Sequence, residues 1–175
     1  MQTGQVRSIV VMGVSGSGKS TIALALAKRS HLEFVDGDSL HSPENLAKMS
    51  RGVALSDDDR TPWLNAIGRQ LRLAQSSSVG LVVACSALKR QYRDLLRTYD
   101  PEIFFVMLEG TEALIRSRIE ARPHEFMPAS LLATQFAILE PLESDERGMC
   151  VDIALSPQDI VVQIEAKLSD GAKRS

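Results

Sequence analysis

Cysteine, aromatic residues and long apolar runs are all scarce in this chain of 175 residues. The two cysteines, Cys85 and Cys150, lack metal-type spacing and predict buried thiols in a reducing compartment. No apolar run approaches the roughly 20 residues needed to span a bilayer, so we expect no membrane partner. Basic residues are not in excess either. A net charge of −2 and a pI near 5.9 disfavour a nucleic acid partner.

The first residues lead almost directly into an apolar segment, which leaves no room for a secretory signal peptide. Together with the cysteine usage, this predicts a cytoplasmic protein. The length suits one α/β domain over residues 1–175, with its core at about 8–168.

What the sequence does contain is a dense phosphate-binding motif. Residues 13–20 fit the pattern G-x-x-x-x-G-K-[ST] of a P-loop. An apolar, β-branched run at 9–12 precedes the motif, and good helix formers follow it at 21–28, as the motif requires. We expect the ATP-binding residues to be Gly13, Val14, Ser15, Gly16, Ser17, Gly18, Lys19, Ser20 and Thr21.

The residue types in this motif determine its chemistry. Glycines let successive backbone N–H groups turn inward, at a helix N-terminus that already favours an anion. Lys19 adds a positive charge for the β- and γ-phosphates of ATP, and the Ser20 hydroxyl is the expected Mg²⁺ ligand. A glycine-rich turn without a ligand is the alternative, and the full motif in its proper setting disfavours it.

Strand-like runs alternate with helical patterns along the rest of the chain. We expect strands at 9–12, 33–35, 81–85, 104–108 and 151–155. Helices are expected at 21–28, 43–49, from 57 to a polar loop at 75–78, at 88–99, from 111, at 129–139 and from 157, with a frayed tail after 169. This alternation predicts a five-stranded parallel sheet with helices on both faces.

Two carboxylates follow the second expected strand, in Asp36-Gly37-Asp38. Ligands of open parallel sheets bind beyond the carboxyl ends of strands, so we expect these groups near the phosphates. The same residues would also make a good turn or cap a helix, and their position favours the functional interpretation. The strand at 81–85 ends without a Walker-B-type aspartate, which leaves Asp36 as the nearest candidate to hold a metal-bound water.

Several basic residues and one loop are further candidates. Arg60 stands early in an expected helix, where its charge opposes the helix dipole. A solvated face is the default for the basic residues of 89–97, although Arg93 could reach an anionic ligand. The polar segment 122–128, bounded by prolines, predicts a short mobile lid over a site.

Several motifs follow one another in a fixed order along about residues 8–155. They are residues 12–20, Asp36-Gly37-Asp38 with Leu40-His41, Lys48-Met49, 55–60 with 62–64, 85–89 with Tyr92-Arg93, 126–128, 131–132 and Gln135-Phe136. In these motifs and their order the chain resembles gluconokinases. Members of this family often carry Gly-His-Phe-Met in the lid, whereas this chain has His124-Glu125-Phe126-Met127.

The resemblance implies a P-loop kinase fold that transfers a phosphoryl group from ATP to the 6-hydroxyl of D-gluconate, and a homodimer. Asp38 is the candidate to orient or deprotonate that hydroxyl, and Lys19, Arg118 and Arg122 would supply positive charge. The candidates to bind gluconate are Asp38, His41, Arg60, Arg93 and Gln135. The rival interpretations are a shikimate or nucleoside-monophosphate kinase and a regulatory module that binds ATP without turnover.

Overall fold

The computed structural model describes residues 8–77, 79–121 and 129–172. All five strands lie in one parallel sheet with the order β2-β3-β1-β4-β5. This arrangement confirms the α/β fold and the parallel sheet expected from the sequence. The strands are β1 (Ser8–Met12), β2 (Glu33–Asp36), β3 (Leu81–Ala84), β4 (Phe104–Glu109) and β5 (Gly148–Asp152).

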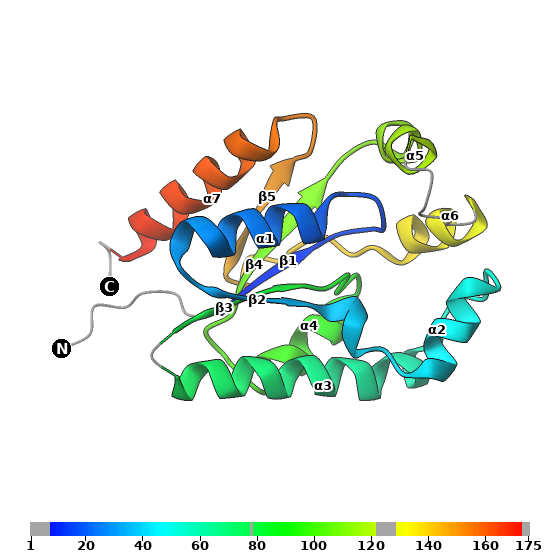
Figure 1. Ribbon diagram of the computed structural model, residues 1–175, viewed down its shortest axis with the longest axis horizontal. Coiled ribbons are helices and arrows are strands. Elements are labelled where there is room, and N and C mark those ends of the chain that lie inside the picture. Colours follow the sequence, from blue (N-terminus) through cyan, green and yellow to red (C-terminus); the bar gives the residue numbers. More distant parts are fainter. Residues whose placement is uncertain (1–7, 78, 122–128, 173–175) are drawn as a thin grey trace.

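Helices cover both faces of the sheet. Figure 1 shows α1 and α7 on one face and α3 and α4 on the other. The helices are α1 (Lys19–Ser30), α2 (Pro43–Ser50), α3 (Asp57–Ser76), α4 (Arg90–Arg97), α5 (Glu112–Glu120), α6 (Ala129–Ile138) and α7 (Pro157–Ala172), with a 3-10 turn, η1 (Gly37–Leu40).

The central strand explains why two hydrophobic cores form. Successive side chains of a strand point to opposite faces, and every residue of β1 is buried. Ile9 and Val11 join the core under α1 and α7, whereas Val10 and Met12 join the core over α3 and α4. A short, wholly apolar strand therefore holds both helical layers and delivers the P-loop from the middle of the sheet.

The start of α3 is held by a capping box. The Ser56 hydroxyl accepts a hydrogen bond from the Asp59 backbone N–H, and the Asp59 carboxylate accepts one from the Ser56 N–H. The expected apolar stripe of this helix is buried, including Trp63 and Ile67. This cap and stripe fix the direction of the first turn, which carries Arg60 of the site described below.

The fifth strand was predicted three residues too late, because β5 spans Gly148–Asp152 and not 151–155. This strand lies at the edge of the sheet and pairs only with β4, so part of it is exposed. Ile153 is fully buried although it follows the strand, and its apolar neighbours drew the prediction toward the wrong end.

Three helix boundaries and one cysteine also differ from expectation. Helix α3 continues through Ser76, where a loop was predicted from residue 75, and α7 continues to Ala172. Helix α4 begins at Arg90 because the preceding Lys89 has an extended backbone. Cys85 is buried as predicted, whereas Cys150 on the edge strand is exposed.

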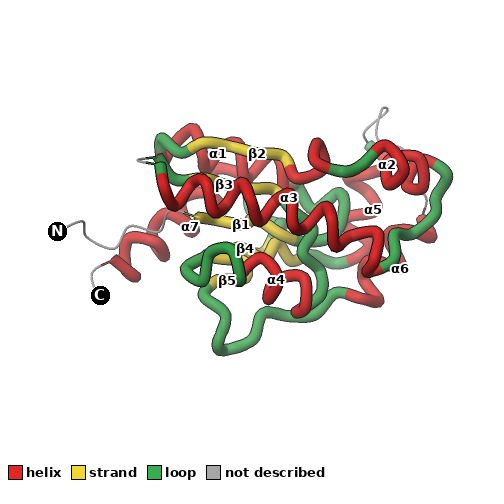
Figure 2. The backbone as a smooth tube through the Cα atoms, turned by 90° about the horizontal axis from the view of Figure 1, so that it is seen from below, coloured by secondary structure: helices red, strands yellow, loops and turns green. Residues whose placement is uncertain are grey.

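The carboxyl ends of the strands meet at one end of the molecule. Helices α2, α5 and α6 gather at that end, away from the end of α7 (Figure 2). Within the described residues, every helix falls short of the length and apolarity needed to cross a membrane. The predicted lid at 122–128, including Arg122 and His124, lies outside the described residues.

Candidate active site

The loop between β1 and α1 has the geometry of a phosphate-binding turn. Gly16 has a φ of +78°, and a Cβ at this position would approach the Ile119 side chain to 2.5 Å. Gly18 caps α1 in a left-handed conformation without a side-chain cap, which leaves N–H groups of the first turn for an anion. The Lys19 ammonium folds back over the loop and donates to the Val14 carbonyl at 3.0 Å.

Two oxygen groups meet where the metal was expected. The Ser20 hydroxyl donates to Asp36 Oδ2 at 2.8 Å, and Asp36 Oδ1 accepts the Asp38 backbone N–H at 3.1 Å. Hydroxyl and carboxylate oxygens are the hard donors that Mg²⁺ prefers. Their placement at the start of α1 therefore fits Mg²⁺, and the second hydrogen bond holds the Asp36 carboxylate in position.

A cavity of about 290 Å³ opens beside the P-loop. It brings together six of the predicted site residues, from four separate parts of the chain. They are Ser15, Lys19, Asp38, His41, Arg60 and Gln135. Within the described part of the chain nothing donates a side-chain hydrogen bond to the Asp38 carboxylate, which leaves it open to a ligand.

Sequence reasoning did not identify the rest of the cavity wall. Ser86 follows β3 in the way that Asp38 follows β2, so its place beyond a strand end could have marked it. Thr134 precedes Gln135 on α6 and had no signal of its own. The remaining lining residues include an apolar group from α2 and the loop after it, namely Leu46, Met49 and Val53.

An aromatic pair forms one side of this cavity. The rings of His41 and Trp63 stack with their centroids 4.2 Å apart, and Trp63 Nε1 donates to the Gly37 carbonyl at 2.7 Å. Burial lowers the pKa of His41 below its usual value, and the nearby Asp38 opposes this shift only in part. His41 Nδ1 is buried and has no hydrogen-bond partner among the described residues. The imidazole is therefore neutral at pH 7, a form in which one ring nitrogen donates a hydrogen bond and the other accepts one.

Arg60 supplies a positive charge to the same cavity. One of its terminal nitrogens, Nη1, donates to the Leu55 carbonyl and, at 3.3 Å, to the Tyr92 hydroxyl. Among the described residues, Nε and Nη2 of Arg60 have no acceptor. These free donors make Arg60 suited to an anionic group of a ligand.

Gln135 joins α6 to the P-loop directly. Its amide oxygen accepts a hydrogen bond from the Ser15 backbone N–H at 2.7 Å, and its amide nitrogen lies 3.4 Å from the Ser15 hydroxyl. The predicted role was a contact to the acceptor substrate. The geometry shows in addition that this amide accepts a hydrogen bond from a backbone N–H of the P-loop.

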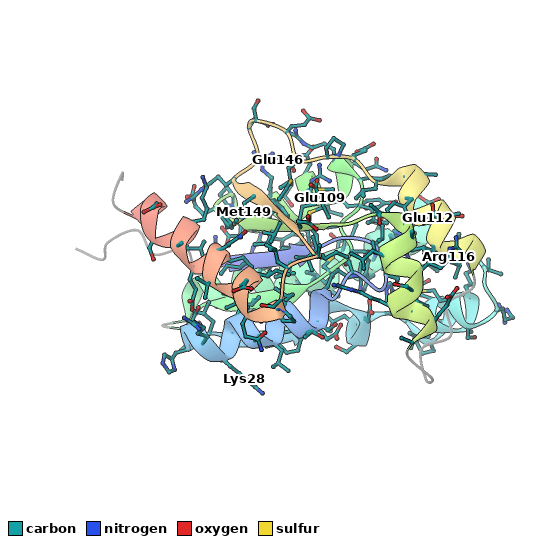
Figure 3. The ribbon with its side chains drawn as sticks, turned by 90° about the horizontal axis from the view of Figure 1, so that it is seen from above. Lys28, Glu109, Glu112, Arg116, Glu146 and Met149 are labelled. Carbon is teal, nitrogen blue, oxygen red and sulfur yellow. The ribbon has the colours of Figure 1, made fainter. Side chains whose placement is uncertain are left out.

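Arg93 does not lie at this site, contrary to prediction. Its side chain is fully buried and paired with Glu146, with Nε to Oε1 at 2.6 Å. Figure 3 shows Glu146 in the segment before β5. All five guanidinium N–H groups are used within the protein, so none remains for a substrate. The other acceptors are the second oxygen of Glu146 and the carbonyls of Ala87, Leu88, Glu140 and Pro141.

Arg118 lies beside the P-loop but in a second hollow of about 330 Å³. This hollow contains neither Lys19 nor Asp38, and Arg118 donates to the Ile153 carbonyl there. The geometry therefore favours a contact to another part of the nucleotide over the predicted role at the transferred phosphate. The hollow is lined by Ser17, Gly18, Thr21, Ile22, Arg118, Ala121, Leu155, Pro157 and Ile160.

Comparison with known proteins agrees with this geometry. The family described as "AAA domain" matches residues 9–142. A gluconokinase of Gluconobacter oxydans is 47% identical, covering 90% of this chain and 88% of its own length. A gluconokinase of Arabidopsis thaliana is 42% identical over 91% of this chain and 89% of its own length.

A solved structure gives the same result in three dimensions. The crystal structure of a gluconokinase from Sinorhizobium meliloti 1021 superposes with a TM-score of 0.88 at 47% identity, and covers 97% of this chain and 95% of its own. This similarity covers nearly the whole length of both chains and is not confined to the P-loop. This chain therefore belongs to the gluconokinase family of P-loop kinases.

Proposed function

We propose that this chain transfers the γ-phosphoryl group of ATP to the 6-hydroxyl of D-gluconate, which yields 6-phosphogluconate and ADP. The observation that carries the proposal is the cavity shared by Lys19, Asp38 and Arg60. It combines a phosphate-binding lysine, an open carboxylate and a free guanidinium, which match the three kinds of group that the reaction requires. Membership of the gluconokinase family supports the choice of acceptor.

Gluconate would lie in the cavity with its two ends at different partners. The free donors of Arg60 suit its carboxylate, because a guanidinium binds a carboxylate through two parallel hydrogen bonds. The neutral His41 nitrogen and the Gln135 amide would contact hydroxyls along the chain. This orientation would direct the 6-hydroxyl at the far end toward Asp38 and the P-loop.

The chemical step would exchange one phosphorus–oxygen bond for another. The 6-oxygen attacks the γ-phosphorus as the bond to the β-phosphate oxygen breaks, and the hydroxyl proton passes to the Asp38 carboxylate. Lys19 and the backbone N–H groups of the P-loop neutralise the phosphate charge throughout. Phosphoryl transfer depends mostly on positioning and electrostatics, so we expect charge neutralisation to contribute more than proton removal.

Mg²⁺ would be held by the Ser20 hydroxyl, with Asp36 contacting a metal-bound water, and would neutralise charge on the β- and γ-phosphates. Arg118 would contact the nucleoside part of ATP in the second hollow, which Thr21 and Pro157 also line. Arg122, from the segment outside the described residues, stays a candidate to deliver positive charge to the transferred phosphate.

Two further properties, the oligomeric state and the cellular location, are proposed on other grounds. We expect a homodimer because the resemblance to gluconokinases implies one, and sedimentation velocity of the purified protein would test it. We also propose a cytoplasmic location, because Cys85 and Cys150 are both free thiols, which a reducing compartment favours.

The test is ADP production with Mg²⁺ and ATP across a panel of acceptors. The panel holds gluconate, shikimate, AMP, glucitol as the analogue without a carboxylate, and sugar acids that differ at single hydroxyls. We expect turnover with gluconate and a large loss with glucitol, and the Lys19→Ala variant should lose several kcal/mol of transition-state stabilisation. Equal turnover of shikimate or AMP would overturn the assignment. Tight ATP binding without any turnover would favour a regulatory module.

A further inference from the structure

Three polar side chains meet beside the cavity, and one of them lines it. Asp57 is the first residue of α3, Arg60 lies one turn later, and Tyr92 comes from α4. The Tyr92 hydroxyl donates to Asp57 Oδ1, and the same hydroxyl lies 3.3 Å from Arg60 Nη1. The Arg60 guanidinium also lies over the Tyr92 ring, with its carbon 5.6 Å from the ring centroid. The cavity is lined by Arg60 but not by Asp57 or Tyr92.

The chemistry of Arg60, Tyr92 and Asp57 determines the direction of the two hydrogen bonds that join them. A guanidinium can only donate, and an ionised carboxylate can only accept. The hydroxyl between them must therefore donate its one proton to Asp57 and accept from Arg60. Neither hydrogen bond can be reversed, so these three side chains have a single hydrogen-bonded arrangement as long as Asp57 is ionised.

Asp57 is held in its ionised form by neighbours at the start of α4. Lys89 Nζ lies 2.8 and 3.0 Å from its two oxygens, and Gln91 Nε2 donates at 2.9 Å. The hydrogen bond from Lys89, followed by that from Tyr92, lowers the pKa of Asp57 to about 2. The carboxylate is thus charged at neutral pH, and its donors tie the start of α3 to the start of α4.

Arg60 needs such support because its position is unfavourable in two respects. A cation in the first turn of a helix opposes the dipole, and a long flexible side chain loses entropy when it is held in one conformation. The Leu55 carbonyl and the Tyr92 hydroxyl both take Nη1, which leaves Nε and Nη2 directed elsewhere. These two contacts therefore determine which edge of the guanidinium faces the cavity.

We propose that Tyr92 and Asp57 are positioning residues that hold Arg60 in the orientation in which its free edge binds the substrate carboxylate. The inference rests on the proposed function for the identity of that carboxylate. It assigns substrate recognition to two residues that do not touch the substrate. Their effect should appear in the binding of gluconate and not in the binding of ATP, because the hydrogen bonds from Asp57 and Tyr92 lead to Arg60 and not to the P-loop.

The first test is the Tyr92→Phe variant, which removes one hydroxyl and keeps the ring. We expect the KM for gluconate to rise about three- to tenfold, as for the loss of one hydrogen bond, with kcat and the KM for ATP nearly unchanged. Tyr99→Phe is the matched control, because the Tyr99 hydroxyl joins the end of α4 to Asn65 of α3 at 2.9 Å, outside the cavity. An unchanged gluconate KM in Tyr92→Phe, or the same rise in Tyr99→Phe, would overturn the proposal.

A double-mutant cycle then asks whether Tyr92 acts through Arg60. In the Arg60→Gln background, Tyr92→Phe should have little further effect on the gluconate KM. Additive effects of the two changes would mean that Tyr92 acts by another route, and would contradict the inference.

A third measurement needs no substrate and separates this inference from the proposed function. In protein labelled with ¹⁵N-arginine, the Nε–H signal of Arg60, assigned through Arg60→Gln, should report a rigid side chain. Tyr92→Phe should make this signal mobile, whereas Tyr99→Phe should leave it rigid. If gluconate is not phosphorylated but the signal behaves in this way, the proposed function fails, and the inference that Tyr92 and Asp57 position Arg60 stands. A signal that does not respond to Tyr92→Phe overturns the inference, whatever the substrate.

Discussion

Arg93 of α4 and Arg60 of α3 have opposite relations to their surroundings. Arg93 is fully buried and uses every N–H group within the protein, whereas Arg60, held by the adjacent Tyr92, keeps two nitrogens without an acceptor among the described residues. Tyr92 and Arg93 are neighbours in sequence and serve these two different regions. A saturated cation stabilises the fold, and a partly saturated one is available to a ligand.

The saturated region holds the segment between α6 and β5 against α4. Arg93 donates to Glu146 and to carbonyls of this segment, while Arg90 of the same helix pairs with Asp145 at 2.7 Å. Burial alone would raise the pKa of Glu146, but the hydrogen bonds from Arg93 and from the Glu143 backbone outweigh it and lower that pKa. This segment leads into β5, so the pair secures the start of a strand at the edge of the sheet.

The largest expected effect is the loss of the saturated pair. Arg93→Met should lower the free energy of unfolding by about 3–5 kcal/mol, because Glu146 is left buried without its partner. Arg97→Met is the matched control on the same helix, since Arg97 is partly exposed and its ion pairs should contribute at most about 1 kcal/mol. Urea denaturation measures both. Equal losses in the two variants would remove the distinction between the regions.

Loss of the open cation should have the second largest effect, on activity alone. Arg60→Gln should raise the KM for gluconate roughly 10- to 100-fold, because a charge-assisted hydrogen bond contributes about 1.5–3 kcal/mol. The melting temperature and the KM for ATP should stay close to those of the wild type. A variant that loses stability but still binds gluconate normally would show that Arg60 belongs with Arg93 as a structural cation.

The smallest expected effect concerns the neutral histidine of the cavity. Because burial lowers the pKa of His41, the folded state takes up its proton less readily than the unfolded chain. Its contribution to stability is therefore complete above the unfolded pKa of about 6.5 and is lost as the pH falls through the lower folded pKa.

His41→Phe keeps a ring over Trp63 and should flatten the decline in unfolding free energy between pH 7 and pH 5. His31→Asn is the control, because His31 is an exposed residue beyond the end of α1 and Asn tolerates its left-handed backbone. Denaturation at a series of pH values measures the slope. A slope that His41→Phe leaves intact would mean that the histidine is not held neutral by the fold.

Figure 3 also shows an ordinary surface pair for comparison, in which Glu112 and Arg116 lie one turn apart on α5 with 2.6 Å between their nearest charged atoms. Both side chains are exposed, so such a pair adds only about 0.3–0.5 kcal/mol. Arg116 carries the same charge as Arg93 and Arg60. The three arginines differ in how deeply they are buried and in how many of their N–H groups have an acceptor within the protein.

Much of the site could be predicted because its signals are local. The P-loop, the strand before it and the carboxylates of Asp36 and Asp38 depend on residues within a few positions of one another. The early position of Arg60 in a helix was a local signal too, because a cation there needs a reason. The prediction erred for Arg93, because its ion-pair partner Glu146 decides its role and lies 53 residues away, in a segment without a recognisable pattern.

The sequence by itself determined the class of fold, the phosphate-binding turn and the ends of strands at which ligands bind, because backbone conformation and hydrophobic periodicity depend on near neighbours. Only the tertiary structure decided which cations remain open to a ligand. Packing brought Tyr92 and Asp57 together behind Arg60, enclosed Arg93 around Glu146 and placed Arg118 in a separate hollow from Lys19. The physical reason is that burial and hydrogen-bond saturation depend on partners distant in sequence, which three-dimensional packing selects.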